Sequence, residues 1–159
     1  FRFDEGRASS LEAASRALAA MDIAALSERL VDTLSGGEAQ RVALAALAAQ
    51  EATWWLLDEP AHHLDPARQV AVYRTLGERW RAGQGMVAVT HDVNLLAHAA
   101  PGEHAERLLV LGLANGQVQF QVPLADPALA ERLTTLFGAT VRAVDVDGVR
   151  RFVVLGESP

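Results

Sequence analysis

Two adjacent carboxylates, Asp58 and Glu59, follow a short apolar run in the middle of the sequence. The run spans residues 53–57, and its length and composition predict a strand that is buried on both faces of a parallel sheet. Sheets of this kind bind ligands at the carboxyl ends of their strands. One carboxylate there suits Mg²⁺, which takes few protein oxygens beside waters and substrate phosphates, and the other can orient or activate a water. The alternative is that both carboxylates only end the strand and solvate a turn.

A serine, two glycines and a glutamate precede a run of good helix formers at residues 39–50. Ser35 and Glu38 fit the S-x-x-E capping box, which stabilises the start of any helix. The same segment, with Gly36 and Gly37, can instead bind a phosphate, because a helix N-terminus offers unpaired N–H groups and the positive end of the helix dipole. These four residues alone leave both interpretations open.

A histidine and an aspartate, His91 and Asp92, follow a second apolar run at residues 85–90, which predicts another buried strand. The histidine can act as a general base, as a phosphate contact or as a structural group. Taken without its neighbours, it is interpreted as structural.

The elements that must position these residues alternate between helices and strands, which predicts an α/β fold. The expected helices span residues 9–30 with a break near Asp22, 39–50, 66–82, 93–99 and 126–137. The expected strands span residues 53–57, 85–90, 107–111, 117–121, 141–146 and 149–155. Helix starts are signalled by an N-cap aspartate followed by proline, at Asp65-Pro66 and Asp126-Pro127. Tight turns between strands are signalled at Asn115-Gly116 and Asp147-Gly148.

The composition fits one ordinary globular domain and excludes several classes of protein. Of the 159 residues, 50% are hydrophobic, and 20 acidic against 14 basic residues give a formal charge of −6, which argues against a nucleic-acid partner. The absence of cysteine excludes a disulfide framework and a thiolate metal site. All 14 basic residues are arginine, so the chain has no lysine. The longest apolar run, at residues 42–49, is far shorter than the roughly 20 residues that cross a bilayer.

Four segments, taken together in their order, resemble the motifs of the nucleotide-binding domain of ABC (ATP-binding cassette) ATPases. They lie at residues 34–41, 56–60, 63–65 and 90–92. The resemblance implies the C-terminal part of a P-loop NTPase fold, in which helices flank a parallel sheet and a helical segment carries the signature motif. It divides the chain into a helical subdomain remainder at residues 1–50, half of the catalytic core at 51–122, and a C-terminal helix with a terminal β-hairpin at 123–159.

The resemblance assigns the family signature to Ser35, Gly36, Gly37 and Glu38. In the family, the serine hydroxyl and the glycine amides contact the γ-phosphate of an ATP molecule that a second ATPase subunit holds, so the site is shared across a dimer. Asp65 resembles the D-loop aspartate, which couples the two ATP sites of such a dimer. ATP and Mg²⁺ are therefore the expected cofactors.

The carboxylates and the histidine also acquire roles from the resemblance. Asp58 resembles the Walker B carboxylate that reaches Mg²⁺, usually through water, and Glu59 resembles the carboxylate that polarises the attacking water. His91 resembles the switch histidine at the γ-phosphate. The implied reaction is in-line attack of water on the γ-phosphoryl group, with catalysis mostly by positioning and charge stabilisation. His62 and His63 fill positions that vary within the family and are interpreted as local packing without a metal.

Some parts of the family pattern are missing from this sequence. The phosphate-binding loop, Gly-x-x-x-x-Gly-Lys-[Ser/Thr], cannot be formed by a chain without lysine, and neither the adenine-stacking aromatic residue nor the Q-loop glutamine is matched before Leu34. The resemblance thus covers the C-terminal part of the domain, and Phe1 is interpreted as a cut edge. We expect the chain alone to hydrolyse little or no ATP and to leave apolar faces of its sheet exposed.

Among ABC proteins, the sequence favours the ATPase subunit of an importer. Such a subunit is a peripheral protein on the cytoplasmic face of the plasma (inner) membrane. Its expected partners are membrane-spanning permease subunits and, indirectly, a substrate-binding protein. Residues 108–121 and 124–127 resemble the importer pattern, in which a hairpin leads to a helix after the core. Residues 93–95 and 129–148 are similar to ATPases that serve iron-siderophore, haem and cobalamin uptake.

Two alternatives belong to other classes. The first is the C-terminal lobe of a chromosome-maintenance or DNA-repair head, against which stand the acidic charge and the lack of heptads at residues 9–32. The second is a short partner that donates residues 35–37 to another ATPase in trans, which would leave the other matched motifs unused.

Overall fold

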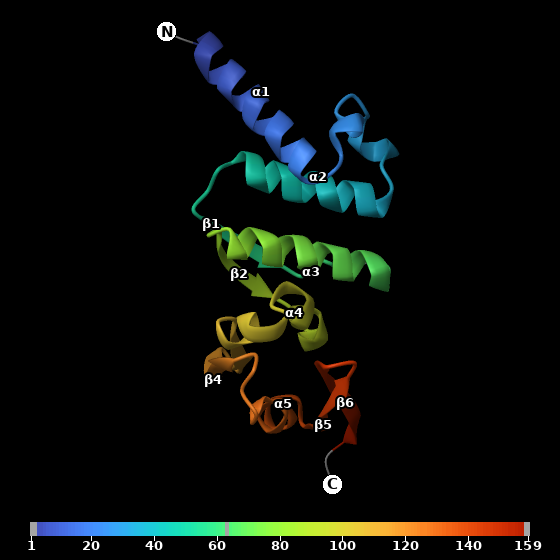
Figure 1. The fold of residues 1–159 in the computed structure, drawn as a ribbon, viewed down its shortest axis with the longest axis vertical. Helices are drawn as coiled ribbons and strands as arrows, with labels where there is room; N and C mark the ends of the chain where they lie inside the picture. The colour runs from blue at the N-terminus through green and yellow to red at the C-terminus, as the bar shows by residue number, and fades with distance from the viewer. Residues whose placement is uncertain (1–2, 63, 158–159) are drawn as a thin grey trace. The chain divides into compact units, whose positions relative to one another are not determined.

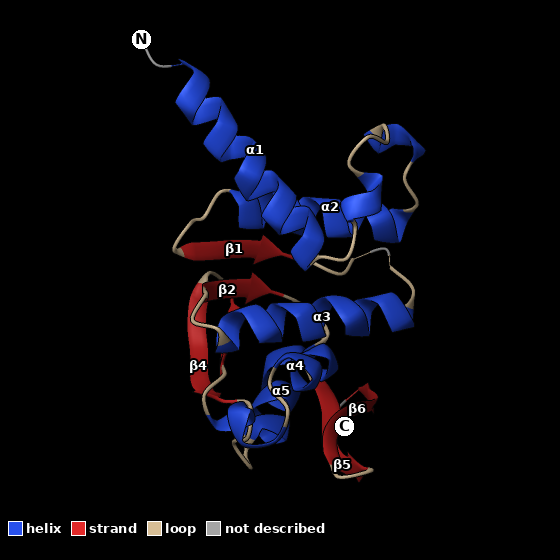
Figure 2. Cartoon of the chain, turned by 45° about the horizontal axis from the view of Figure 1, so that its top comes forward, coloured by secondary structure: helices blue, strands red, loops and turns tan. Residues whose placement is uncertain are grey.

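Helices and strands alternate along the chain in the expected order, and the computed structural model describes residues 3–62 and 64–157 (Figures 1 and 2). The α-helices are α1 (Phe3–Ala20), α2 (Gly36–Ala49), α3 (Pro66–Arg81), α4 (Val93–Ala99) and α5 (Leu129–Phe137). The strands are β1 (Trp54–Asp58), β2 (Gly85–Val89), β3 (Leu109–Ala114), β4 (Gln117–Pro123), β5 (Ala139–Val146) and β6 (Val149–Glu157). Short 3₁₀ helices lie at Ala24–Leu26, Val31–Thr33 and Gly102–Glu106.

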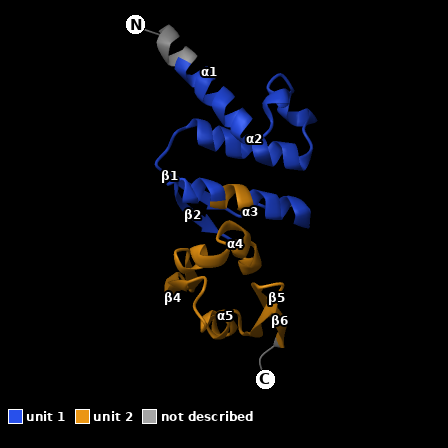
Figure 3. Ribbon diagram, in the orientation of Figure 1, with its two compact units in different colours: residues 1–72, 78–90 blue, residues 73–77, 91–159 orange. Residues whose placement is uncertain are grey.

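The chain divides into two compact units (Figure 3). Unit 1 comprises residues 1–72 and 78–90, and unit 2 comprises residues 73–77 and 91–159, so that helix α3 contributes to both. No helix in the described part of the chain is long and apolar enough to span a membrane.

In unit 1, helices α1 and α2 pack against each other through small and aliphatic side chains. Ala13, Ala17, Leu44 and Ala45 are all buried. Helix α1 ends at Ala20 and Asp22 adopts a left-handed φ of 55°, which confirms the predicted break. The predicted helical continuation to residue 30 is wrong, because only Ala24–Leu26 follows, as a 3₁₀ helix. A left-handed residue cannot continue a right-handed helix, so the chain leaves α1 and reaches α2 through two 3₁₀ turns.

Strands β1 and β2 form a parallel pair in unit 1, in register from Trp54 opposite Gly85 to Asp58 opposite Val89. The parallel pairing is confirmed, but burial on both faces is wrong. Trp55 is 2% exposed, whereas Trp54 and Leu56 are 62% and 76% exposed. Successive side chains of a strand point to opposite faces, and within the described residues only one face of this pair is covered.

Two helices show how well the cap signals predict helix starts. Asp65 caps α3 by accepting a hydrogen bond from the Arg68 N–H at 3.1 Å, with Pro66 as the first helical residue. Helix α5, however, begins at Leu129 rather than at the predicted Asp126-Pro127 signal. The Asp126 carboxylate instead accepts from the N–H of Ala128 at 2.7 Å, which forms an Asx turn and delays the helix.

Besides residues 73–77 of α3 and the 3₁₀ helix at Gly102–Glu106, unit 2 contains α4, α5 and two antiparallel hairpins, β3–β4 and β5–β6. Both turns are where the sequence predicts them, with positive φ at Asn115-Gly116 and Asp147-Gly148, as type I′ turns require. Strand β3 begins at Leu109 and not at residue 107, because the N–H groups of Arg107 and Leu108 still donate to the His104 carbonyl in a turn that follows the 3₁₀ helix. The buried side chains of unit 2 include Leu95, Phe120, Leu129, Leu133, Val141 and Phe152.

Candidate functional site

The start of helix α2 is closed by a complete capping box. The Ser35 hydroxyl accepts a hydrogen bond from the N–H of Glu38 at 3.4 Å, and the Glu38 carboxylate accepts from the N–H of Ser35 at 2.7 Å. The backbone and side-chain hydrogen bonds from Ser35, assisted by the charges of Arg29 and Arg41, lower the pKa of Glu38. Glu38 therefore stays ionised where the helix dipole favours a negative charge.

The capping box leaves the groups that could bind a phosphate available. A serine hydroxyl has one donor and two acceptor sites, so Ser35 can cap the helix and still donate its O–H to an anion. Gly36 is exposed, and an added Cβ there would meet nothing within 4 Å. The N–H groups of the first helical turn have no partner within the helix. The capping and phosphate-binding interpretations of this segment are therefore compatible.

Arg68 links the start of helix α2 to Asp65. Gly37 is buried, and an added Cβ there would lie 2.8 Å from the Arg68 Cδ and 2.9 Å from its Nε. The Arg68 Nε lies 3.1 Å from the Asp65 carboxylate. One arginine side chain thus packs over the second glycine and pairs with the aspartate that caps α3.

Asp58 and Glu59 lie at the carboxyl end of β1, where the sequence predicts a ligand site. Asp58 is exposed, and its carboxylate has no hydrogen bond or ion pair within the described residues. Glu59 has a left-handed φ of 45°, and its N–H donates to the Val89 carbonyl at 3.0 Å. A left-handed backbone is strained for a residue with a side chain, and such strain concentrates at functional sites.

The donor set at this end of β1 fits Mg²⁺ in the manner of a nucleotide-bound ion. Asp58 offers exposed carboxylate oxygens, which are the ligands that this hard cation prefers. The described residues contain no group of three or more histidine, aspartate or glutamate side chains that could hold a metal by themselves. The remaining ligands would be waters and phosphate oxygens.

Two glutamines hold the loop that follows the carboxylates. The Gln40 side-chain amide, on α2, donates to the carbonyl of Pro60, and that of Gln69, on α3, donates to the carbonyl of Ala61 at 3.5 Å. Because Pro60 directly follows Glu59, the contact of Gln40 connects helix α2 to the loop after Glu59 within unit 1.

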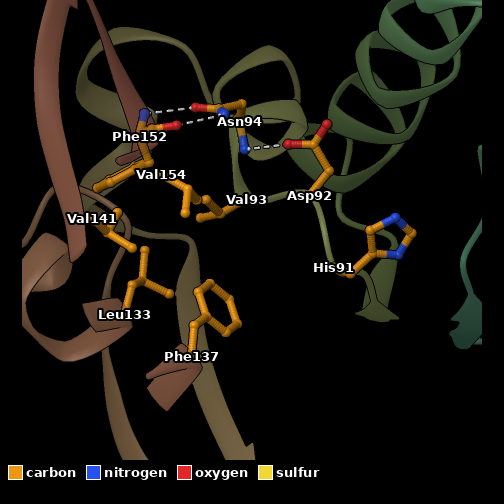
Figure 4. A pocket seen from close by; sticks show the side chains of 9 residues that line it. All are labelled: His91, Asp92, Val93, Asn94, Leu133, Phe137, Val141, Phe152 and Val154. Carbon is orange, nitrogen blue, oxygen red and sulfur yellow. Dashed lines mark hydrogen bonds between the residues drawn. The ribbon is translucent and has the colours of Figure 1, made fainter. Parts of the chain in front are cut away.

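His91 and Asp92 belong to unit 2, at the start of helix α4 (Figure 4). Asp92 is the N-cap of α4 and accepts from the N–H of Asn94 at 2.9 Å. A cavity of about 220 Å³ lies beside this helix start. Its lining is mainly apolar, with His91, Asp92 and Asn94 among Val93, Leu133, Phe137, Val141, Phe152 and Val154.

Unit 1 connects most of the predicted site residues with one another, through side chains that sequence reasoning did not single out. Gln40 and Arg68 make these connections, and Arg68 could have been found from its position three residues after the N-cap Asp65, where an i,i+3 ion pair forms. His62 is exposed, and its N–H donates to the Glu59 carbonyl at 2.9 Å. His63 lies outside the described residues.

Comparison with known protein sequences identifies relatives. A family model described as ABC transporter matches residues 4–62. The hemin import ATP-binding protein HmuV of Nocardia farcinica is 38% identical over 129 residues, which cover 81% of this chain and 42% of that protein. The ferric enterobactin transport ATP-binding protein FepC of Escherichia coli is 33% identical over 159 residues, which cover 98% and 56%. The chain spans about half the length of the curated relatives it matches.

Comparison with solved structures finds the same fold. An inward-facing ABC transporter assigned to the metal-chelate type matches with a TM-score of 0.76 and 26% sequence identity. The match covers 91% of this chain and 57% of that one. An α/β fold with a parallel strand pair, helices and terminal hairpins is thus shared over most of the present chain.

Proposed function

Because the chain belongs to the ATP-binding subunits of ABC transporters, of which it represents a part, we propose that it contributes half of an ATPase cassette that drives import of an iron complex. The observation that carries the proposal is the start of helix α2, where Ser35 and Gly36 are open to an anion and Gln40 contacts the loop after Glu59. The names of the two relatives and the resemblance of residues 93–95 favour haem or an iron-siderophore over other cargo. Cobalamin has the support of the resemblance alone.

In this proposal, the residues of the chain act on ATP by position and charge. The Ser35 hydroxyl and the first amides of α2 would hold the γ-phosphate, as a helix N-terminus holds anions. Glu59 would accept a hydrogen bond from the attacking water and orient it in line with the γ-phosphorus, and His91 would contact the γ-phosphate. Asp58 would hold Mg²⁺, usually through water, and the ion would neutralise charge on the phosphate oxygens.

The proposal also extends to partners and location. The signature would face ATP held by a second ATPase subunit, with Asp65 at the coupling between the two sites. Membrane-spanning permease subunits would receive the motion of this dimer, and a substrate-binding protein would take part indirectly. The subunit would be peripheral, on the cytoplasmic face of the inner membrane.

The chain by itself would be inactive, because a chain without lysine cannot form the loop that holds the β- and γ-phosphates. The test is a completed subunit, in which this chain replaces the matched segment of the Escherichia coli relative, a match that covers 98% of the chain. We expect the completed subunit to hydrolyse ATP and the 159-residue chain alone to release no phosphate above background.

The assignment of Glu59 has its own test in the completed subunit. Glu59→Gln removes the charge that orients the water and keeps the shape of the side chain, so we expect turnover to fall at least about 100-fold while ATP binding persists. Glu131→Gln, at an exposed position of α5, is the matched control and should turn over like the parent. Equal turnover in both variants would refute the catalytic role of Glu59.

A further inference from the structure

The side-chain amide of Asn94, in the first turn of α4, pairs with the backbone of Phe152 in strand β6 (Figure 4). Its Nδ2 donates to the Phe152 carbonyl at 3.0 Å, and its Oδ1 accepts from the Phe152 N–H at 2.8 Å. Because the amide both donates and accepts, it bonds to the backbone of Phe152 in the way that a neighbouring strand would. This pair fixes one edge of the C-terminal hairpin to the start of α4.

The remaining polar groups of Asn94 are also bonded. Its N–H donates to the Asp92 carboxylate at 2.9 Å, and its carbonyl accepts from the Arg151 guanidinium at 3.1 Å. Asn94, three residues after His91, is therefore held through its N–H by the helix cap. Its carbonyl and its side chain are held by the hairpin.

Apolar packing beside this contact is incomplete. The cavity of about 220 Å³ lies between the start of α4, helix α5 and the hairpin, among Val93, Leu133, Phe137 and Val154. Phe137 and Val154 are 49% and 59% exposed, so this pocket is open to solvent. The hydrogen bonds of Asn94 therefore join α4 to β6 beside an open, mainly apolar pocket.

We propose that Asn94 is a positioning residue for His91. The C-terminal hairpin, through Asn94, holds the first turn of α4, and this turn fixes the backbone that presents His91 to the nucleotide. The inference rests on the proposed function, in which His91 contacts the γ-phosphate, and adds to it a role for a hairpin that supplies none of the matched motifs.

The same hairpin offers a matched control on its other strand. The Thr134 hydroxyl, on α5, accepts from the Val141 N–H at 2.9 Å and lies 3.3 Å from the Val141 carbonyl. Thr134→Val removes this attachment with little change in side-chain shape. It loosens the hairpin from α5 and leaves the contact with α4 in place, so it reports what general loosening of the hairpin does.

The experiment measures kcat and KM for ATP in the completed subunit with Asn94→Ala, Thr134→Val, His91→Ala and the double variant Asn94→Ala/His91→Ala. Asn94→Asp, which keeps the acceptor for the Phe152 N–H and loses the donor, is a milder second variant. We expect Asn94→Ala to lower kcat about 10-fold, as misplacement of a reacting group does, with KM within about twofold of the parent. Asn94→Asp should lie between Asn94→Ala and the parent, and Thr134→Val should match the parent.

The double variant separates positioning from a structural role. If Asn94 acts through His91, Asn94→Ala causes no further loss of kcat once His91 is alanine, because coupled residues are not additive. Losses that multiply, or equal losses in Asn94→Ala and Thr134→Val, would overturn the inference alone. An unchanged kcat in His91→Ala would overturn the proposed role of His91 and the inference with it.

Discussion

The side-chain amide of Gln40, in helix α2, donates a hydrogen bond to the carbonyl of Pro60, in the loop after strand β1. Twenty residues separate the two positions. Gln40 lies two residues after Glu38, the capping glutamate of α2, and Pro60 directly follows Glu59. The contact therefore connects α2 to the loop after Glu59, the carboxylate that we propose orients the attacking water.

Replacing Gln40 should accordingly affect turnover more than stability. Gln40→Ala removes one part-buried hydrogen bond, which costs about 1 kcal/mol in the free energy of unfolding, and releases the carbonyl of Pro60. In the completed subunit we expect kcat to fall several-fold. Gln119→Ala, which removes only local hydrogen bonds in the β3–β4 hairpin, is the control. A Gln40→Ala variant with parental kcat would show that the contact does not orient Glu59.

The left-handed backbone of Glu59 favours glycine for stability, whereas the proposed catalysis needs the carboxylate. An L-residue pays about 1–2 kcal/mol for this conformation and glycine pays almost nothing. We expect Glu59→Gly to unfold at a higher urea concentration than Glu59→Ala and to be catalytically as inactive. Urea unfolding of the two variants compares them directly. If alanine were the more stable of the two, the backbone at this position would not be strained.

The stability of unit 2 should depend on pH through His98. Burial, followed by the charges of Arg151 and Arg74, lowers the pKa of His98 below its ordinary value of 6.5, against the opposing effect of Asp92. The folded state therefore binds fewer protons than the unfolded state at pH values just below 6.5, and its stability falls as the pH falls through this range. Well above pH 6.5 His98 is neutral in both states, and the free energy of unfolding no longer changes with pH through this group.

The measurement for His98 is urea unfolding at pH 7.5 and pH 5.5. We expect His98→Gln, which cannot be protonated, to lose less stability between these pH values than the parent does. His62→Gln, at an exposed histidine of unit 1, is measured beside it to show what the loss of another histidine does. Identical losses in His98→Gln and the parent would exclude this histidine as the source of the pH dependence.

The exposed face of the β1–β2 pair should make the chain alone prone to association. Trp54, Leu56, Val87 and Val89 are each more than half exposed on this short sheet, and apolar patches of this kind promote aggregation. We expect the double variant Leu56→Gln/Val87→Thr to raise the highest concentration up to which the 159-residue chain stays monomeric, as measured by light scattering. Changes at Leu30 and Val31, which are exposed on a 3₁₀ turn and its flank, should have less effect.

Local signals in the sequence predict most of the secondary structure, because caps and turns depend on neighbouring residues. The capping box of Ser35 and Glu38, the N-cap of Asp65 and the turn at Asn115 are present as predicted. The delayed start of α5 is a local competition, in which the Asp126 carboxylate binds an N–H two residues onward before the helix begins.

What the sequence could not predict depends on partners far along the chain. Gln40 with Pro60 and Asn94 with Phe152 are separated by 20 and 58 residues, and no local pattern identifies such pairs. Strand burial depends in the same way on partners far along the chain. The apolar run at residues 53–57 alone predicts that both faces are covered, whereas Trp54 and Leu56 are exposed within the described residues, as expected for a chain that matches only the C-terminal part of the family pattern.

The central claim, that the signature acts on the nucleotide of a second subunit, has a direct test in mixed dimers of the completed subunit. Gly36→Asp places a carboxylate in the open space at the start of α2, where it should repel a phosphate without disturbing the fold. This variant and Glu59→Gln should each be inactive alone. When they are mixed, one site of each mixed dimer combines an intact Glu59 with an intact signature.

The measurement is steady-state phosphate release from the mixture. If the signature acts in trans, we predict that turnover returns to about a quarter of the parental rate, because half of the dimers are mixed and each has one intact site. If the signature acts within its own subunit, every site in the mixture carries a defect. A mixture as inactive as its two components would contradict the account.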